Sequence, residues 1–150
     1  MSPLTLVAVH TPAQVEHLRV IRNECRLFMT RDTSFVSPGQ QSLWFGALDR
    51  AQMHPYLLAA ADTTAEPQGY GLIRLDDDAS LISGGLLEKF RGQGIGKVLF
   101  ALLVDKARSL SDAAVELEVL ETNIRARRVY EKLGFAALAA REGVLHMRLK

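Results

Sequence analysis

The chain has 150 residues, 48% of them apolar, which predicts a single domain over residues 1–150 with a sizeable core. Its 18 basic and 17 acidic residues leave a net charge of +1, which argues against a general attraction to nucleic acid or to an anionic membrane. A lone cysteine, Cys25, excludes an intrachain disulfide, and no apolar run reaches membrane-spanning length, so we expect a protein of the reducing cytoplasm.

The first half of the chain predicts three strands and two helices. In chain order we expect a strand at 4–9, a helix opened by Thr11-Pro12, a loop at 30–39, a helix at 40–50 that begins with Ser37-Pro38, and strands at 56–61 and 70–75 separated by a polar turn at 63–68. One face of the first helix is apolar, and we expect it to be buried: Val15, Leu18, Ile21, Cys25 and Phe28.

The second half of the chain predicts four strands and two helices. A hairpin at 76–78 leads to a strand at 80–87, a long helix at 94–109, a strand at 115–120, a helix at 123–132 ended by Gly134, and strands at 135–140 and 144–149 joined by a turn at 141–143. Five apolar residues of the long helix are expected to face inward: Ile95, Val98, Leu99, Leu102 and Leu103. This order predicts an α/β (α+β) fold whose mixed, largely antiparallel sheet of about seven strands carries helices on both faces.

A glycine-rich stretch, Arg91 to Lys97, lies directly before the long helix. Glycines at alternate positions remove side chains that would keep a polyanion from the backbone, and the helix that follows presents unpaired N–H groups. The spacing does not match the nucleoside-triphosphate loop, because Lys97 precedes Val98 rather than Ser or Thr. It does not match the dinucleotide fingerprint either. What remains is Arg-x-x-Gly-x-Gly, for which a tight turn before a surface helix is the alternative interpretation.

A second motif, Asn123 to Phe135, follows the next predicted strand. The two motifs together resemble the GNAT superfamily of acyl-CoA-dependent N-acyltransferases. The shared features, in order, are Arg-x-x-Gly-x-Gly on a strand-turn-helix, a strand, Asn, a short helix with Ala and Tyr, and Leu-Gly-Phe. The resemblance covers residues 80 to 136. It implies an enzyme with acetyl-CoA as cosubstrate and no metal, whose two adjacent parallel strands splay apart to hold the cofactor.

The resemblance also implies which residues hold the cofactor. The loop would bind the pyrophosphate, and exposed strand backbone at Gly84, Gly85 and Leu86 would pair with the pantetheine arm. The glycine pair departs from the bulkier residues usual there, and it indicates a bulge, a wider groove or both. The cofactor-binding residues are then Gly84, Gly85, Leu86, Arg91, Gly92, Gln93, Gly94, Ile95, Gly96, Lys97, Asn123 and Tyr130.

A general base is useful to such an enzyme, because an alkyl ammonium with a pKa of about 10.4 is almost fully protonated at neutral pH. Glu118 is the candidate base, since Leu117-Glu118-Val119 resembles the segment in which some relatives place a catalytic glutamate. Strand alternation turns Glu118 away from its apolar neighbours, so it faces either the cleft or solvent. Lesser candidates are Glu121 and a water chain from Asp77 or His54.

Tyr130 is the candidate acid that would protonate the leaving thiolate, by resemblance; the alternative is a core residue. It lies two helical turns after Asn123, on the same helix face. Asn123 would hold the pantetheine or cap its own helix.

The resemblance implies that the acceptor is a primary amine that attacks the thioester directly in a ternary complex. Residues 22–50 loosely resemble relatives that acetylate amino sugars or other small amines, which favours a small acceptor such as an amino sugar, amino acid or polyamine. A protein or peptide amine is the alternative acceptor, and a non-catalytic acyl-CoA-binding domain is the alternative from another class. Trp44 and Phe45 would floor an acceptor pocket or belong to the core. Asp32, Asp49 and His54 would bind a cationic amine or be solvated. A homodimer is left open.

Overall fold

The computed structural model describes residues 3–61 and 66–150, and its elements follow the expected order. The strands are β1 (Leu4–Ala8), β2 (Met53–Ala60), β3 (Gly69–Leu75), β4 (Ala79–Leu86), β5 (Ala114–Leu120), β6 (Phe135–Arg141) and β7 (Val144–Leu149). The helices are α1 (Pro12–Glu24), α2 (Pro38–Gly46), α3 (Ile95–Leu110) and α4 (Ile124–Leu133), with 3-10 turns η1 (Arg26–Phe28) and η2 (Glu88–Phe90). The polar turn predicted at 63–68 lies largely outside the described residues.

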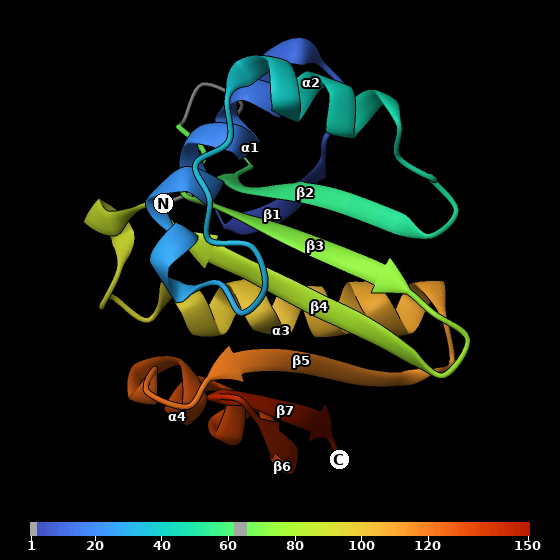
Figure 1. The fold of residues 1–150 in the computed structure, drawn as a ribbon, viewed down its shortest axis with the longest axis vertical. Helices are drawn as coiled ribbons and strands as arrows, with labels where there is room; N and C mark the ends of the chain where they lie inside the picture. Colours follow the sequence, from blue (N-terminus) through green and yellow to red (C-terminus); the bar gives the residue numbers. More distant parts are fainter. Residues whose placement is uncertain (1–2, 62–65) are drawn as a thin grey trace.

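The strands form one seven-stranded sheet in the order β1-β2-β3-β4-β5-β7-β6. All neighbours are antiparallel except β4 and β5, which run parallel in the middle of the sheet. Figure 1 shows the strands stacked from β2 to β6, with α3 lying behind β4. The predicted mixed, largely antiparallel sheet with helices on both faces is therefore confirmed.

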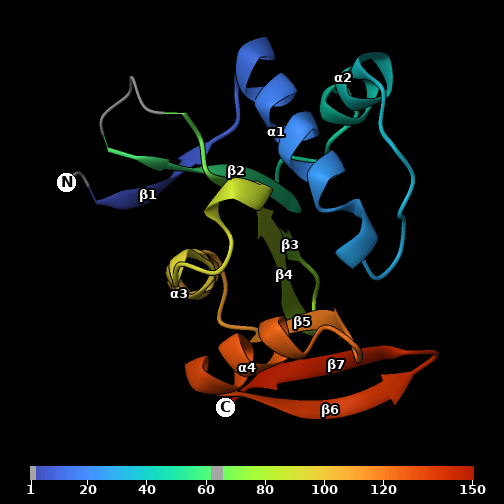
Figure 2. The same cartoon turned by 90° about the vertical axis from the view of Figure 1, so that its left-hand side faces the viewer.

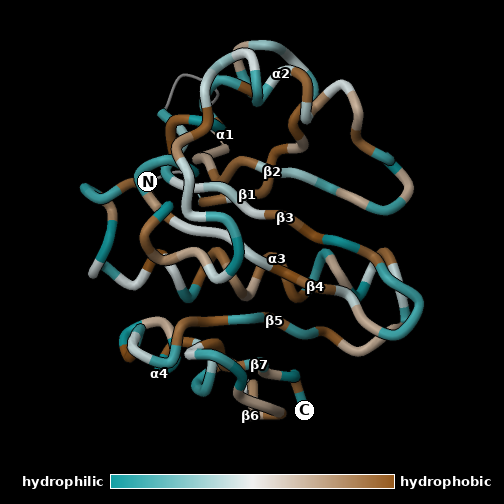
Figure 3. The backbone as a smooth tube through the Cα atoms, viewed as in Figure 1, coloured by the Kyte–Doolittle hydropathy of each residue, from teal (hydrophilic) through white to brown (hydrophobic). Residues whose placement is uncertain are grey.

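Helices α1 and α2 lie on one face of β1 to β4, and α3 lies on the other face, where α4 packs beside it (Figure 2). The larger core cluster joins α3 and α4 to the sheet and includes Leu58, Ile73 and Leu99. A smaller one joins α1 to the opposite face and includes Leu18 and Ile21. In Figure 3, hydrophobic segments run along the central strands, whereas the turn between β3 and β4 is hydrophilic. No helix within the described ranges is long and apolar enough to cross a membrane.

Both helices of the N-terminal half begin at the residues that the sequence predicts. Thr11 and Ser37 are the N-caps, and each forms a capping box with a glutamine three residues later, Gln14 and Gln40. A proline occupies the first turn of each helix, where its missing N–H costs nothing.

Three details of the sequence prediction are wrong. The second helix ends at Gly46 rather than at Arg50, because the chain turns at Asp49, whose carboxylate accepts a hydrogen bond from the Ala51 backbone at 3.0 Å. Phe28 is 49% exposed, because α1 ends at Glu24 and the following 3-10 turn changes the direction of the side chains. Val98 is 41% exposed, and the buried face of α3 instead carries Phe100 and Val104. Cys25 is buried, as expected.

Candidate active site

The central parallel strands separate part-way along their length. Register pairs between β4 and β5 run from Ala79 with Ala114 to Leu81 with Glu116. Beyond that point β4 continues its pairing with β3 as far as Leu86, and β5 continues its pairing with β7 as far as Leu120. The strands therefore diverge, and a cleft of about 840 Å³ opens between them.

The two glycines of β4 allow other backbone and side chains to approach this strand closely. A Cβ atom on Gly85 would lie 2.6 Å from the Cys25 sulfur, and one on Gly84 would collide with the Tyr70 carbonyl. The β3–β4 register is continuous through both glycines, so the predicted bulge is absent from this pair. Gly85 instead lets Cys25, at the end of α1, pack directly on the strand that forms one wall of the cleft.

The glycine-rich loop forms the end of the cleft that borders α3. Gly92 and Gly94 have φ angles of 77° and 81°, a left-handed conformation that favours glycine over residues with a Cβ. Gly94 is the N-cap of α3 and has no side chain to cap it, so the first N–H groups of that helix remain available to an anion. Gly96 and Lys97 also line the cleft.

Arg91 turns inward from this loop. Its guanidinium donates hydrogen bonds to the carbonyl of Leu86 at 3.1 Å and to that of Glu24 at 3.0 Å, and it lies 5.2 Å from the centre of the Phe28 ring. Arg91 therefore connects the end of β4 to the end of α1. It lines the cleft, but its side chain is already bound within the protein.

Glu118 lies on β5 and faces the cleft rather than the apolar core. Its neighbours Leu117 and Val119 are buried, as the alternation of the strand requires. Arg31 reaches it from the loop after η1 and donates two hydrogen bonds to Oε1, at 3.0 and 2.5 Å. Both of these contacts involve the same oxygen, so Oε2 remains free of Arg31.

Tyr130 lies on α4 and also lines the cleft. Its ring is 4.7 Å from that of Phe100 and 6.2 Å from that of Phe135, both at steep edge-on angles. Burial raises the pKa of the Tyr130 phenol above its usual value, so the group keeps its proton throughout the neutral range. A buried neutral phenol at this position can donate a proton.

Asn123 borders the cleft and caps α4, because its side-chain oxygen accepts a hydrogen bond from the Ala126 backbone at 3.3 Å. The structure brings most of the predicted cofactor set to this one cleft. Gln93 and Ile95 are the exceptions: neither lines the cleft, and the Gln93 amide donates to the Lys89 carbonyl at 3.1 Å.

Several residues considered from the sequence lie away from the cleft: His54, Asp49, Asp77 and Glu121. The His54 ring is 3.4 Å from the Ala51 carbonyl. Trp44 and Phe45 are half-buried and pack against the smaller core cluster. Asp32 does line the cleft, but its carboxylate accepts hydrogen bonds from the backbone and hydroxyl of Ser34.

The cleft residues that were not singled out from the sequence as site residues include Tyr70, Arg31, Arg74 and Arg125. Arg31 and Glu118 are 87 positions apart, so no local pattern connects them. Arg125 could have been found from the sequence, since it lies two residues after the helix cap Asn123. Its guanidinium lies beside the glycine-rich loop, 3.6 Å from where a Cβ atom would stand if Gly92 had one.

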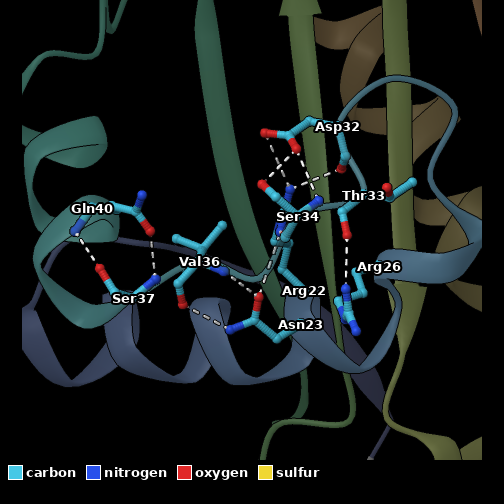
Figure 4. Close-up of polar contacts among 9 residues, drawn as sticks. All are labelled: Arg22, Asn23, Arg26, Asp32, Thr33, Ser34, Val36, Ser37 and Gln40. Carbon is cyan, nitrogen blue, oxygen red and sulfur yellow. Dashed lines mark hydrogen bonds and ion pairs between the residues drawn. The ribbon is translucent and has the colours of Figure 1, made fainter.

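The loop that carries Arg31 is held by side chains of α1 and η1 (Figure 4). Asn23 both donates to and accepts from the Val36 backbone, at 2.9 Å each. Arg22 donates to the carbonyls of Asp32, at 3.0 Å, and Ser34, and Arg26 donates to that of Thr33 at 3.2 Å. These hydrogen bonds hold the loop in place as one wall of the cleft.

Comparison with known families identifies this arrangement. The model of the Acetyltransferase (GNAT) family matches residues 18–135, which include both walls of the cleft and the glycine-rich loop. The chain belongs to this family. It is therefore an acyltransferase, and acetyl-CoA is its cosubstrate. The uncapped start of α3 and the open edge of β4 fit a ligand with a pyrophosphate and an amide-bearing arm.

Individual relatives agree with this assignment. A Bacillus subtilis (strain 168) protein, provisionally named a [ribosomal protein bS18]-alanine N-acetyltransferase, is 26% identical over 125 residues, 83% of this GNAT chain and 81% of the relative. The spermidine N-acetyltransferase of Vibrio cholerae, solved with CoA and spermine, superimposes with a TM-score of 0.81 at 15% identity, over 97% and 94% of the two chains. RimL, a ribosomal L7/L12 α-N-protein acetyltransferase solved with coenzyme A, superimposes with a TM-score of 0.77 at 16% identity, over 99% and 93%. At these identities the two structures show a shared fold.

Proposed function

We propose that this protein transfers the acetyl group of acetyl-CoA to a primary amine of a small molecule, by direct attack within a ternary complex. The observation that carries the proposal is the cleft between β4 and β5, which is lined by the glycine-rich loop before α3 and by both Glu118 and Tyr130. The end of the cleft next to the glycine-rich loop suits the cofactor, and the rest of the cleft leaves room for the amine.

Cofactor binding would use backbone more than side chains. The pyrophosphate would lie on the N–H groups at the start of α3, where a helix end stabilises an anion by roughly 0.3–1 kcal/mol, and up to about 2 when the site is partly buried. The pantetheine amides would pair with the open edge of β4 at Gly84, Gly85 and Leu86. Lys97 and Arg125 flank the loop and would add positive charge. Arg91 would act indirectly, by holding β4 and α1 in place.

The chemical step needs one proton acceptor and one proton donor. The amine nitrogen attacks the thioester carbonyl carbon, and Glu118 removes a proton from that nitrogen, directly or through a water. The tetrahedral intermediate then collapses, the C–S bond breaks, and the Tyr130 hydroxyl gives its proton to the departing sulfur. The products are an N-acetyl amide and free CoA.

Acceptor-dependent release of CoA tests the proposal. We would titrate the free thiol across a panel of amino sugars, amino acids, polyamines and short peptides, and measure acetyl-CoA binding by calorimetry. Release with a small amine is the expected result. Absence of acetyl-CoA binding would contradict the cofactor site.

An acceptor on a protein is the second candidate. The observation that favours it is the B. subtilis relative, which covers most of both chains and is named for the N-terminal alanine of a ribosomal protein. A peptide that begins with alanine in the same panel distinguishes the two: release with that peptide and with no small amine would replace the first candidate by the second.

A further inference from the structure

The part of the cleft next to α1 is rich in arginine. This part, which we call the acceptor half, lies between the loop after η1 and the faces of β3 to β5 that point toward α1. Five charged residues of the acceptor half line the cleft: Arg22, Arg31, Asp32, Arg74 and Glu118. Three are cationic and two are anionic, and Asp76, which does not line the cleft, lies 3.5 Å from Arg74.

Both carboxylates already have cationic partners. Glu118 Oε1 accepts two hydrogen bonds from Arg31, and Asp32 Oδ2 lies 3.8 Å from the Arg22 guanidinium. Among the described residues that line the acceptor half, none offers a carboxylate without an arginine beside it. A polyamine would therefore place its second ammonium group among arginines.

Arg74 differs from the other two arginines because it has unused hydrogen-bonding capacity. Arg22 is bound to loop carbonyls, and Arg31 is bound to Glu118. The Nε atom of Arg74 is buried and has no hydrogen-bond partner, and its ion pair with Asp76 is loose, at 3.5 Å. A guanidinium has five N–H donors and binds carboxylate or phosphate with two parallel hydrogen bonds. The Arg74 side chain is 36% exposed, so an anion in the acceptor half would bind its terminal N–H groups.

We propose that the acceptor carries one primary amine together with an anionic group, a carboxylate or a phosphate, and that Arg74 binds the anionic group. The inference rests on the proposed function, since it describes the second substrate of the same cleft. The amine lies at Oε2 of Glu118, which Arg31 leaves free. Apolar side chains of the acceptor half, Met29, Met53 and Leu72, contact the body of the acceptor between its two charged ends.

Amino acids and phosphorylated amino sugars both carry a primary amine and an anionic group. Each is compared with a matched compound that lacks the anionic group. An amino acid and its amide differ in the carboxylate alone, as methionine and methionine amide do. Glucosamine 6-phosphate and glucosamine differ in the phosphate. Spermidine and a peptide that begins with alanine and has an amidated C-terminus represent amines without an anion. CoA release is measured for all six with the wild-type protein.

We expect the anionic member of one pair to exceed the partner that lacks the anion at least tenfold in kcat/KM. Arg74→Gln should abolish that preference by raising the KM of the anionic acceptor about tenfold at nearly constant kcat, because it removes binding common to the ground and transition states. Arg74→Lys should retain part of the preference. Arg50→Gln is the control, since this exposed arginine lies against Phe45 outside the cleft. Thermal melting and acetyl-CoA affinity of each variant verify that the fold is intact.

The contrary results are distinct. A preference for spermidine, for methionine amide or glucosamine over its anionic partner, or for the amidated peptide would overturn the inference and leave the N-acetyltransferase in place. A preference for the anionic acceptor that survives Arg74→Gln would also overturn it. If no member of the panel releases CoA although acetyl-CoA binds, the inference is also overturned. Failure to bind acetyl-CoA would instead contradict the proposed function.

Discussion

Glu118 and Tyr130 occupy different environments, and these environments suit opposite proton-transfer roles. The carboxylate of Glu118 is partly exposed, at 21% of its side chain, and has an arginine on one oxygen. The phenol of Tyr130 is buried between two aromatic rings, where its neutral form is favoured. A charged, partly hydrated carboxylate can accept a proton, and a buried neutral phenol can donate one. Each role can be tested by a single substitution.

Glu118→Gln should lower kcat/KM by about 10²–10⁴ at neutral pH, the range usual for loss of general acid–base catalysis. The acidic limb of the pH–rate profile should disappear, because the amide cannot take up a proton. Steady-state rates across the pH range measure both effects. The same substitution at Glu121, outside the cleft, should leave the profile unchanged. An acidic limb that persists in Glu118→Gln would exclude this carboxylate as the base.

Tyr130→Phe should reduce kcat by a factor within the same range, without a matching loss of acetyl-CoA affinity, because only the hydroxyl is removed and the ring still packs against Phe100. Calorimetry of acetyl-CoA binding and single-turnover rates separate the two quantities. Tyr56→Phe provides a control, since this buried tyrosine belongs to the core and does not line the cleft. Equal rates for Tyr130→Phe and the wild type would show that the phenol is not the acid.

At the scale of elements, α1 acts as a support for the loop that follows η1. Arg22 and Asn23 near the end of α1, and Arg26 in η1, bind backbone groups of this loop (Figure 4). The same helix packs on β4 through Cys25, at the position where Gly85 leaves room. The loop, the helix and the strand therefore form one continuous wall, and the position of Arg31 depends on all three.

Asn23→Ala should raise the acceptor KM several-fold and leave the KM of acetyl-CoA unchanged. The substitution removes two hydrogen bonds to the Val36 backbone, worth about 0.5–1.5 kcal/mol each, and so loosens the loop that bears Arg31. Gln14→Ala is a matched control on the same helix, because Gln14 also bonds two backbone groups, of His10 and Thr11, at the other end of α1. A rise in the KM of acetyl-CoA, or an equal effect of the control, would contradict the local role of the loop.

At the scale of the whole molecule, the sheet consists of two parts joined by the short parallel pairing of β4 and β5. Side chains strengthen the C-terminal part: Glu116 on β5 is 6% exposed and is bound to two residues of β7, His146 at 2.6 Å and Arg148 at 2.7 Å. Burial opposes the ionisation of Glu116, but the hydrogen bonds from these two side chains outweigh it and hold the pKa of the carboxyl below its usual value. The charged carboxylate therefore stabilises the folded protein.

This cluster predicts a pH-dependent contribution to stability. Because the folded-state pKa of Glu116 is lowered, the contribution is complete above the unfolded-state pKa near 4.5 and is lost as pH falls through the folded-state pKa. Glu116→Gln should lower the free energy of unfolding by about 1–3 kcal/mol at pH 7. The difference from the wild type should shrink toward zero in acid.

Urea unfolding at pH 7, 5 and 3 measures this difference. Glu131→Gln is the control, since this residue of α4 is exposed. A difference that stays constant with pH would contradict the ion-pair explanation.

The sequence by itself determined the features that depend on short stretches of chain. Capping boxes at Thr11 and Ser37, the glycine turn before α3 and the Asn123 cap of α4 all rest on contacts within a few residues, so local patterns predict them. Hydrophobic periodicity likewise predicted the strands and the overall architecture. The alternation of β5 left two directions open to Glu118, toward the cleft or toward solvent.

Tertiary structure alone decided which distant groups meet. Arg31 pairs with Glu118 across 87 positions, and Arg91 binds the Glu24 carbonyl across 67. Gly85 appeared to indicate a bulge, yet it makes room for Cys25 from another element. Such contacts depend on how helices and strands pack, which no short sequence pattern encodes. For this reason the convergence of the glycine-rich loop, β4 and Asn123 on one cleft was largely predictable, whereas the arginines of the acceptor half became evident only in the folded structure.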